Sequence, residues 1–173
     1  GSVNALPALT NGFITFGTLT RSIRLNNRVI KTWANILKKV PNSRLIINSI
    51  NFRYDEMKEI FIEKFKKAGI SRDRLDIGYE SPPWNILRKI DIGLDCFPHN
   101  SGTTLVEHLY MGNPYITLAD RPSVGRIGSH YLNATGHGEW IAHSEEEYVE
   151  KACDLSGNLK NLSKIRQQLR SEM

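Results

Sequence analysis

A run of small hydroxylic residues and a glycine lies where anion chemistry is easiest to support. Ser101, Gly102, Thr103 and Thr104 follow an apolar stretch and open a segment with helical spacing. The first backbone N–H groups of a helix have no intrahelical partners, and a glycine lets an anion approach them closely. The helix dipole favours negative charge at the same place. The pattern fits a phosphate-binding helix N-terminus, but an ordinary capped helix without a ligand fits it equally well.

Two arginines and a glutamate could complete such a phosphate site. Arg21 and Arg24 come just after another predicted strand, and their guanidinium groups are permanently charged, bidentate donors suited to a diphosphate. Glu107 lies one helical turn beyond Thr103, where its carboxylate could accept hydrogen bonds from a ribose. Taken alone, the two arginines also fit the surface charges of an ordinary loop.

Other kinds of site find little support in the sequence. There is no Gly-Lys-Ser/Thr of a Walker loop and no G-x-G-x-x-G after the first strand. The five histidines have no metal-ligand spacing, and no Ser-His-Asp order or adjacent carboxylate pair suggests a catalytic site. Asp91 and Asp95 flank an apolar strand, which is more typical of loop anchors than of general bases.

The segments that position these residues alternate between strand and helix patterns. We predict strands at residues 13–17, 44–48, 75–78, 90–94, 115–118 and 139–142. We predict helices at residues 26–39, 54–68, 103–111, 124–134 and 159–170, and one more that starts after Ser144 and includes Leu155. This alternation predicts an α/β fold, a Rossmann-like, doubly wound and mostly parallel sheet with helices on both faces. Ligands of such sheets bind beyond the carboxyl ends of the strands, where Arg21 and Ser101 lie.

The composition narrows the classes of function further. The 173 residues are 40% hydrophobic and 24% charged, as in a globular domain, and no apolar run reaches the roughly 20 residues that cross a bilayer. Basic and acidic residues are interspersed, so the net charge of +5 favours anionic ligands rather than a nucleic-acid site. Two distant cysteines predict no disulfide framework, and we expect a reducing cytoplasm. Residues 1–12 are expected to be a tag remnant and lead-in to a single lobe of an excised fragment, residues 13–173.

Four stretches, in their order and separation, resemble the C-terminal catalytic lobe of the O-GlcNAc transferase family, glycosyltransferase family 41. They are WANILKKVPNS at residues 33–43, DIGLD at 91–95 leading into NSGTT at 100–104, MGNP at 111–114 and RIGS at 126–129. The resemblance runs from about Phe13 to Arg170. It implies a GT-B architecture, in which two Rossmann-like lobes form the enzyme and the C-terminal lobe binds the nucleotide sugar.

The resemblance also implies an activity and a set of site residues. Such enzymes move a sugar, GlcNAc or a hexose, from a UDP-sugar onto Ser or Thr of a protein, or onto Asn in the N-glucosyltransferase branch. They need no metal or other cofactor, because basic side chains and helix N-termini stabilise the departing diphosphate. Arg24 is assigned this stabilising role, and Glu107 falls where the family has an acidic residue near the ribose. The donor-binding set that the resemblance implies is Arg21, Arg24, Asn100, Ser101, Gly102, Thr103, Thr104 and Glu107.

The implied partners are a UDP-sugar, a protein acceptor, an N-terminal catalytic lobe and tetratricopeptide helices. Without the N-terminal lobe and these helices, this chain alone is expected to be inactive. Three departures from the family pattern stand out. Arg24 replaces a lysine, Gly102 replaces a histidine of some members, and residues 80–84 form a shortened stretch without basic or histidine residues. Two alternatives therefore stay open, which are a GT-B transferase with a non-protein acceptor and a degenerate, non-catalytic binding or scaffold module.

Overall fold

The computed structural model describes residues 2–119 and 126–173, and within them six parallel strands form one sheet. The strands are β1 Thr15–Leu19, β2 Arg44–Asn48, β3 Leu75–Gly78, β4 Ile92–Leu94, β5 Tyr115–Leu118 and β6 Ile141–Ala142. Their order is β3-β2-β1-β4-β5-β6, so the chain builds one half of the sheet outward from β1 and the other half outward from β4. The predicted Rossmann-like, doubly wound sheet is confirmed. Its topological switch point lies between β1 and β4.

Three of the predicted strands have the predicted bounds, and the others differ at their ends. The first strand was predicted at residues 13–17 but runs from Thr15 to Leu19. Thr18 is only 2% exposed, because β1 is central and covered on both faces, so this β-branched residue belongs to the strand rather than to the loop. The fourth strand begins two residues later than predicted. The sixth is only Ile141–Ala142, preceded by the short 3-10 helix η4 Gly138–Trp140.

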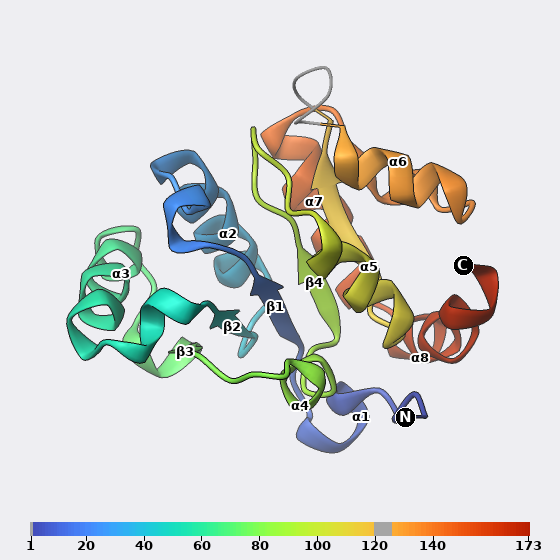
Figure 1. Cartoon of the computed structure of the whole chain (residues 1–173), viewed down its shortest axis with the longest axis horizontal. Coiled ribbons are helices and arrows are strands. Elements are labelled where there is room, and N and C mark those ends of the chain that lie inside the picture. The colour runs from blue at the N-terminus through green and yellow to red at the C-terminus, as the bar shows by residue number, and fades with distance from the viewer. Residues whose placement is uncertain (1, 120–125) are drawn as a thin grey trace.

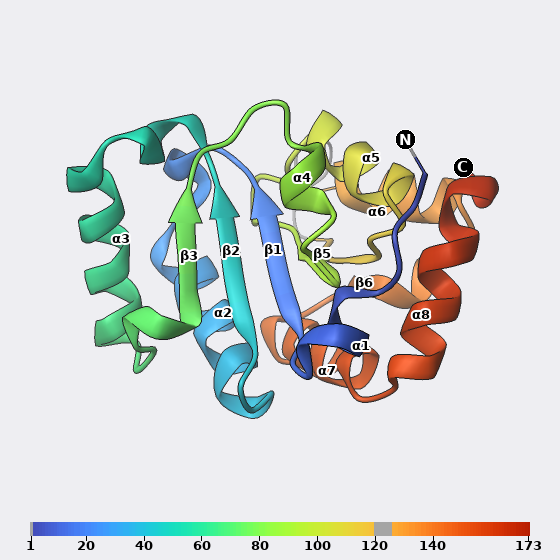
Figure 2. The same ribbon diagram turned by 90° about the horizontal axis from the view of Figure 1, so that it is seen from below.

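Helices cover both faces of the sheet. The main ones are α2 Asn27–Lys39, α3 Asp55–Lys67, α5 Thr103–Tyr110, α6 Ile127–Ala134, α7 Glu145–Ser156 and α8 Leu159–Gln168, which continues into η5 Leu169–Glu172. Right-handed crossovers that proceed in opposite directions from the switch point place α2 and α3 on one face and α5 and α6 on the other. Figure 1 shows this division, and the underside view shows β1, β2 and β3 running side by side (Figure 2). α7 packs against α2, so it belongs to the same face.

The predicted helices form because their apolar stripes meet the sheet, and α2 and α7 are in addition capped by side chains at their N-termini. Val29, Trp33 and Leu37 of α2 are at most 1% exposed. Asn26 accepts a hydrogen bond from the N–H of Val29 at 3.0 Å. Ser144, which directly precedes the helix predicted to start after it, accepts one from the N–H of Glu147 at 3.0 Å. The predicted helix 124–134 begins at Ile127, and residues 124 and 125 lie outside the described residues. Among the described helices, none has the length and apolar character needed to cross a bilayer.

The expected lead-in contains a short helix, α1 Pro7–Asn11, that packs into the fold. Leu6 and Ala8 are 1% exposed, and the N–H of Ala8 donates to the Asp91 carboxylate at 2.9 Å. Asn4 accepts two hydrogen bonds from the buried Arg166 guanidinium, at 2.9 Å on its backbone oxygen and 2.6 Å on its side chain. Arg166 therefore joins the start of the described chain to α8. The second short helix that the sequence pattern did not indicate is α4, Trp84–Leu87.

Two glycines with the same backbone conformation test how tightly this end of the molecule is packed. Gly112 and Gly136 have φ angles of 83° and 81°. A Cβ atom on Gly112 would lie 2.5 Å from the carbonyl oxygen of Arg166, whereas a Cβ atom on Gly136 would meet nothing within 4 Å. We expect Gly136→Ala to lower the free energy of unfolding by about 1 kcal/mol, through backbone strain alone. Gly112→Ala should cost roughly 1 to 3 kcal/mol more. Urea unfolding checks this, and equal losses would contradict the packing described.

Candidate functional site

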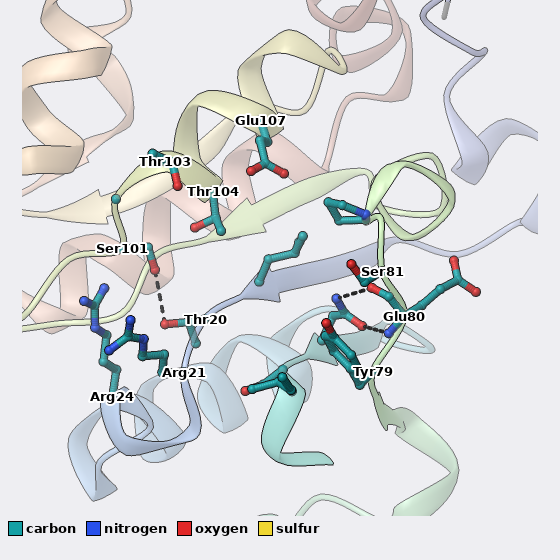
Figure 3. Close-up of a pocket in the computed structure, with 16 residues that line it drawn as sticks. Thr20, Arg21, Arg24, Tyr79, Glu80, Ser81, Ser101, Thr103, Thr104 and Glu107 are labelled. Atoms are coloured by element: carbon teal, nitrogen blue, oxygen red, sulfur yellow. Dashed lines mark hydrogen bonds between the residues drawn. The ribbon is translucent and has the colours of Figure 1, made fainter. Parts of the chain in front are cut away.

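A pocket of about 390 Å³ opens at the carboxyl ends of the strands, beside the switch point between β1 and β4. Its walls come from four segments, which are the end of β1 with the loop that follows, the end of β2 with Ser49 and Ile50, residues 79–83 after β3, and the start of α5. Figure 3 shows the side chains from these segments turned toward a common space. The sheet thus brings together residues that are more than 80 positions apart in the chain.

The N-terminus of α5 forms one side of the pocket. Gly102 is its N-cap residue, and no side chain of the described residues caps this helix. Its first backbone N–H groups are therefore available to an anion, as are the hydroxyls of Thr103 and Thr104, which line the pocket. Glu107 lies one turn further along α5 and also lines the pocket, and burial raises the pKa of its carboxyl group. The structure thus brings together the whole predicted segment from Ser101 to Thr104 with Glu107.

The two predicted arginines lie across the pocket from the start of α5. The 3-10 helix η1 Ser22–Arg24 follows β1 and holds Arg21 and Arg24 at the pocket wall. Nη1 of Arg24 donates a hydrogen bond to the carbonyl oxygen of Asn100 at 2.8 Å, which fixes the guanidinium beside the loop that enters α5. Positive charge is therefore concentrated at this end of the pocket, whereas the carboxylates of Glu80 and Glu107 lie away from it.

Asp95 holds the loop that carries the start of α5. Its carboxylate is fully buried at the end of β4, and it accepts hydrogen bonds from the N–H of Ser101 at 2.9 Å and from the hydroxyl of Thr117 at 2.8 Å. Burial raises the pKa of Asp95 to about 7, although these hydrogen bonds act to lower it. The hydroxyl of Tyr148 donates to the backbone carbonyl of Asp95 at 2.7 Å, so α7 is fixed to the same point.

Asn100 is the one residue of the predicted donor-binding set that does not line the pocket. Its side chain is 1% exposed and points into the protein. Nδ2 donates to the carbonyl of Cys96 at 3.0 Å, and Oδ1 accepts from the N–H of Gly128 at 3.1 Å. The side chain therefore braces the loop against α6, while its backbone carbonyl holds Arg24. Position beside the hydroxylic run does not reveal this inward orientation.

A buried polar cluster joins β1 to this loop beneath the pocket. The hydroxyls of Thr20 and Ser101 are 3.2 Å apart, and the thiol of Cys96 lies 3.4 Å from each of them. Burial raises the pKa of Cys96 to about 11, so the thiol stays protonated at neutral pH and acts as a packing group rather than a nucleophile.

The far end of the pocket contains Glu80 and Ser81 of the shortened stretch, together with Asn48, Ile50 and Tyr79, which the sequence did not single out. Asn48 is the last residue of β2 and Ile50 the first of the 3-10 helix η2 Ile50–Arg53, and Tyr79 and Ser81 follow β3. Their position after a predicted strand was the available signal, because strand ends meet at one edge of a parallel sheet. Their residue types gave no further indication of a ligand.

Solved structures with a similar fold include lobes of GT-B glycosyltransferases. A mutant of the O-GlcNAc transferase of Thermobaculum terrenum matches with a TM-score of 0.92 and 28% identity, over 99% of this chain and 33% of that one. The C-terminal domain of the group 1 glycosyl transferase LpcC of Francisella tularensis has the same fold, with a TM-score of 0.65 and 19% identity, over 98% of this chain and 90% of that one. The fold of the chain is thus that of the Rossmann-like lobes of GT-B glycosyltransferases.

Residues 4–172 match the model of Glycosyl transferase family 41, and the chain belongs to this family. It is 36% identical over 177 residues to the Arabidopsis thaliana protein named Probable UDP-N-acetylglucosamine–peptide N-acetylglucosaminyltransferase SPINDLY. The match covers all of this chain and 19% of the relative. The rice (Oryza sativa subsp. japonica) SPINDLY protein is also 36% identical, with the same coverage. This chain therefore spans 19% of the length of these curated relatives.

The raised pKa of Asp95 gives a stability test of the buried loop anchor. The folded chain holds the proton of this carboxyl more tightly than the unfolded chain does, so ionisation lowers the free energy of unfolding as the pH rises from the ordinary pKa of 3.8 to about 7. Asp95→Asn lacks this titration. The stability of the wild type relative to the variant should fall by roughly 3 kcal/mol between about pH 4.5 and about pH 7.5. Urea unfolding at both pH values measures it, and a difference that does not vary with pH would contradict the assignment.

Proposed function

We propose that this chain is the donor-binding lobe of a protein glycosyltransferase that transfers a sugar, GlcNAc or a hexose, from a UDP-sugar to protein hydroxyls. The observation that carries the proposal is the uncapped N-terminus of α5, which faces Arg21 and Arg24 across the pocket at the switch point. Backbone N–H groups, hydroxyls and guanidinium groups that converge on one space suit a diphosphate. Membership of family 41 supports the same class of donor.

The distribution of charge in the pocket orients the proposed donor. The diphosphate lies at the end formed by Arg24, Thr103 and Thr104, because the carboxylates of Glu80 and Glu107 would repel it elsewhere. The ribose then lies beside Glu107, whose carboxylate accepts hydrogen bonds from the sugar hydroxyls. The nucleobase extends toward Tyr79. The pocket is large enough for a nucleoside diphosphate, since ligand pockets are typically about 300 to 1,000 Å³.

The chemistry that this lobe contributes is stabilisation of the leaving group. Breaking the bond between the sugar and the diphosphate leaves additional negative charge on the diphosphate. Donors already oriented toward that position stabilise the transition state more than the ground state. Arg24 is held in place by its bond to the Asn100 carbonyl, so little reorganisation is needed. In this proposal the cationic side chains and the helix N-terminus do without a metal.

The proposal assigns the acceptor side to protein outside this chain. The curated relatives are about five times longer than the matched region and carry names that describe transfer to peptides. We infer a second catalytic lobe that completes the cleft, tetratricopeptide repeats that present protein acceptors, and a cytoplasmic setting. The 173-residue chain then binds the donor without turnover.

Binding of UDP to the chain tests the diphosphate site. We expect Arg24→Ala to weaken binding about tenfold or more, because a charge-assisted bidentate donor is lost. Arg24→Lys should retain part of the affinity, since it keeps the charge but not the two-pronged geometry. Thr103→Ala should weaken binding about threefold or more. Isothermal titration calorimetry measures these effects.

The matched control is Arg53→Ala, which removes an equal charge from η2 Ile50–Arg53, outside the pocket lining. It should leave the affinity for UDP within about twofold, because exposed charges separated from the ligand are screened. Equal losses for Arg53→Ala and Arg24→Ala would show a non-specific charge effect and would contradict a site at α5.

Turnover separates the enzyme from a scaffold module. In the longer protein that contains this lobe, Arg24→Ala should lower the rate of sugar transfer from UDP-GlcNAc to a protein acceptor by about a hundredfold or more. Transfer measured with protein and with small-molecule or lipid acceptors distinguishes the acceptor classes. A folded, UDP-binding parent that transfers sugar to none of them would favour the non-catalytic alternative.

A further inference from the structure

The side-chain amide of Asn48 continues the hydrogen-bonded ladder between β2 and β3 beyond its last backbone pair. That ladder ends where Asn48 lies opposite Gly78. Beyond it, Oδ1 of Asn48 accepts a hydrogen bond from the N–H of Glu80 at 2.8 Å, and Nδ2 donates to the carbonyl of Glu80 at 3.2 Å. The amide thus takes the place that a backbone peptide unit would occupy. Both polar atoms of the side chain are used, and the residue is 7% exposed.

This pair of hydrogen bonds fixes the wall of the pocket that lies farthest from the arginines. Residues 79–81 leave β3 as a loop, and the Asn48 amide holds the middle of that loop against the end of β2. Figure 3 shows Tyr79, Glu80 and Ser81 at the end of the cavity opposite Arg21 and Arg24, with the two bonds drawn to Glu80. Tyr79 remains 44% exposed although it lines the pocket, so its ring is accessible to a ligand.

We propose that Asn48 is the positioning residue for the nucleoside part of the donor, an inference that rests on the proposed function. It acts through Tyr79 and the Glu80–Ser81 backbone, which it holds as a platform for a planar base. An exposed aromatic ring is the usual stacking partner of a nucleobase. Because Asn48 already occupies the N–H of Glu80, that group does not bind the base edge, whereas the second lone pair of the Glu80 carbonyl and the hydroxyl of Ser81 remain open to it. The phosphate contacts lie at the other end and do not depend on this clamp.

The geometry separates this role from simple support of the fold. A supporting side chain stabilises the whole domain. Its loss lowers the fraction of folded chain and therefore the apparent affinity for every ligand by the same factor. A clamp on residues 79–81 changes only the end of the pocket near the base. Asn113 provides the comparison, because it is fully buried, lies outside the pocket, and donates from Nδ2 to the backbone carbonyl of Leu87 at 3.0 Å.

The experiment compares UDP with inorganic pyrophosphate as ligands of the wild-type chain, Asn48→Ala, Tyr79→Ala, the double variant and Asn113→Ala, by isothermal titration calorimetry. We expect Asn48→Ala and Tyr79→Ala each to lower the affinity for UDP about tenfold. The affinity for pyrophosphate should stay within about twofold of the wild-type value. The double variant should bind UDP no more than about twofold more weakly than either single variant, because both changes remove the same platform. Asn113→Ala should lower the free energy of unfolding without changing the ratio of the two affinities.

Two results would overturn the inference while leaving the proposed function intact. One is an equal loss of affinity for UDP and for pyrophosphate in Asn48→Ala, which indicates a structural role alone. The other is an affinity of Asn48→Ala for UDP that equals the wild-type value. If Asn48→Ala does not fold, Tyr79→Ala decides the question, since its exposed ring can be removed without opening the core. A folded wild-type chain that binds neither UDP nor pyrophosphate would overturn the proposed function and this inference together.

Discussion

The buried carboxylate of Asp95 is the interaction on which the pocket depends. A carboxylate that is buried away from solvent needs hydrogen-bond donors from the protein. The chain provides them from Ser101 at the entry to α5 and from Thr117 in β5. Meeting that requirement sets where the loop after β4 turns and therefore where α5 begins. Tyr148 and Asn100 then attach α7 and α6 to the same loop. The start of α5 is thus fixed from four directions, which is the preorganisation that the proposed leaving-group site requires.

The pocket built on this anchor has two chemically distinct ends. Helix N–H groups, hydroxyls and Arg24 converge at one end, whereas an aromatic ring and a loop held by Asn48 form the other. Both ends lie at the strand termini, so a doubly wound sheet places them opposite each other without a dedicated insertion. The buried cluster of Thr20, Cys96 and Ser101 joins the two halves of the sheet beneath the arginine end. In the proposed donor site, specificity therefore has two separable sources, charge at one end and shape at the other.

Much of this arrangement was predictable from the sequence, since short apolar runs and amphipathic stripes determine strand and helix locally. The hydroxylic run and the two arginines followed from their places after strands. Asn48 and Tyr79 did not, because their residue types gave no indication of a ligand, and the bonds from the Asn48 amide to the loop after β3 leave no periodic signal. The inward orientation of Asn100 is likewise decided by tertiary contacts with Cys96 and Gly128. The short helix α1 also escaped detection, since its burial depends on Asp91, more than 80 residues away.

The central claim is that a nucleoside diphosphate binds at the N-terminus of α5 and contacts the arginines after β1. The most direct measurement is an NMR titration of the isotopically labelled chain with UDP, in which the backbone amides of Thr103 and Thr104 and the side chains of Arg21 and Arg24 are followed. The account predicts saturable shift changes at these groups and smaller changes at α3 and α8, on the far sides of the fold. Millimolar UDP that leaves the Thr103 and Thr104 amides unshifted would contradict it.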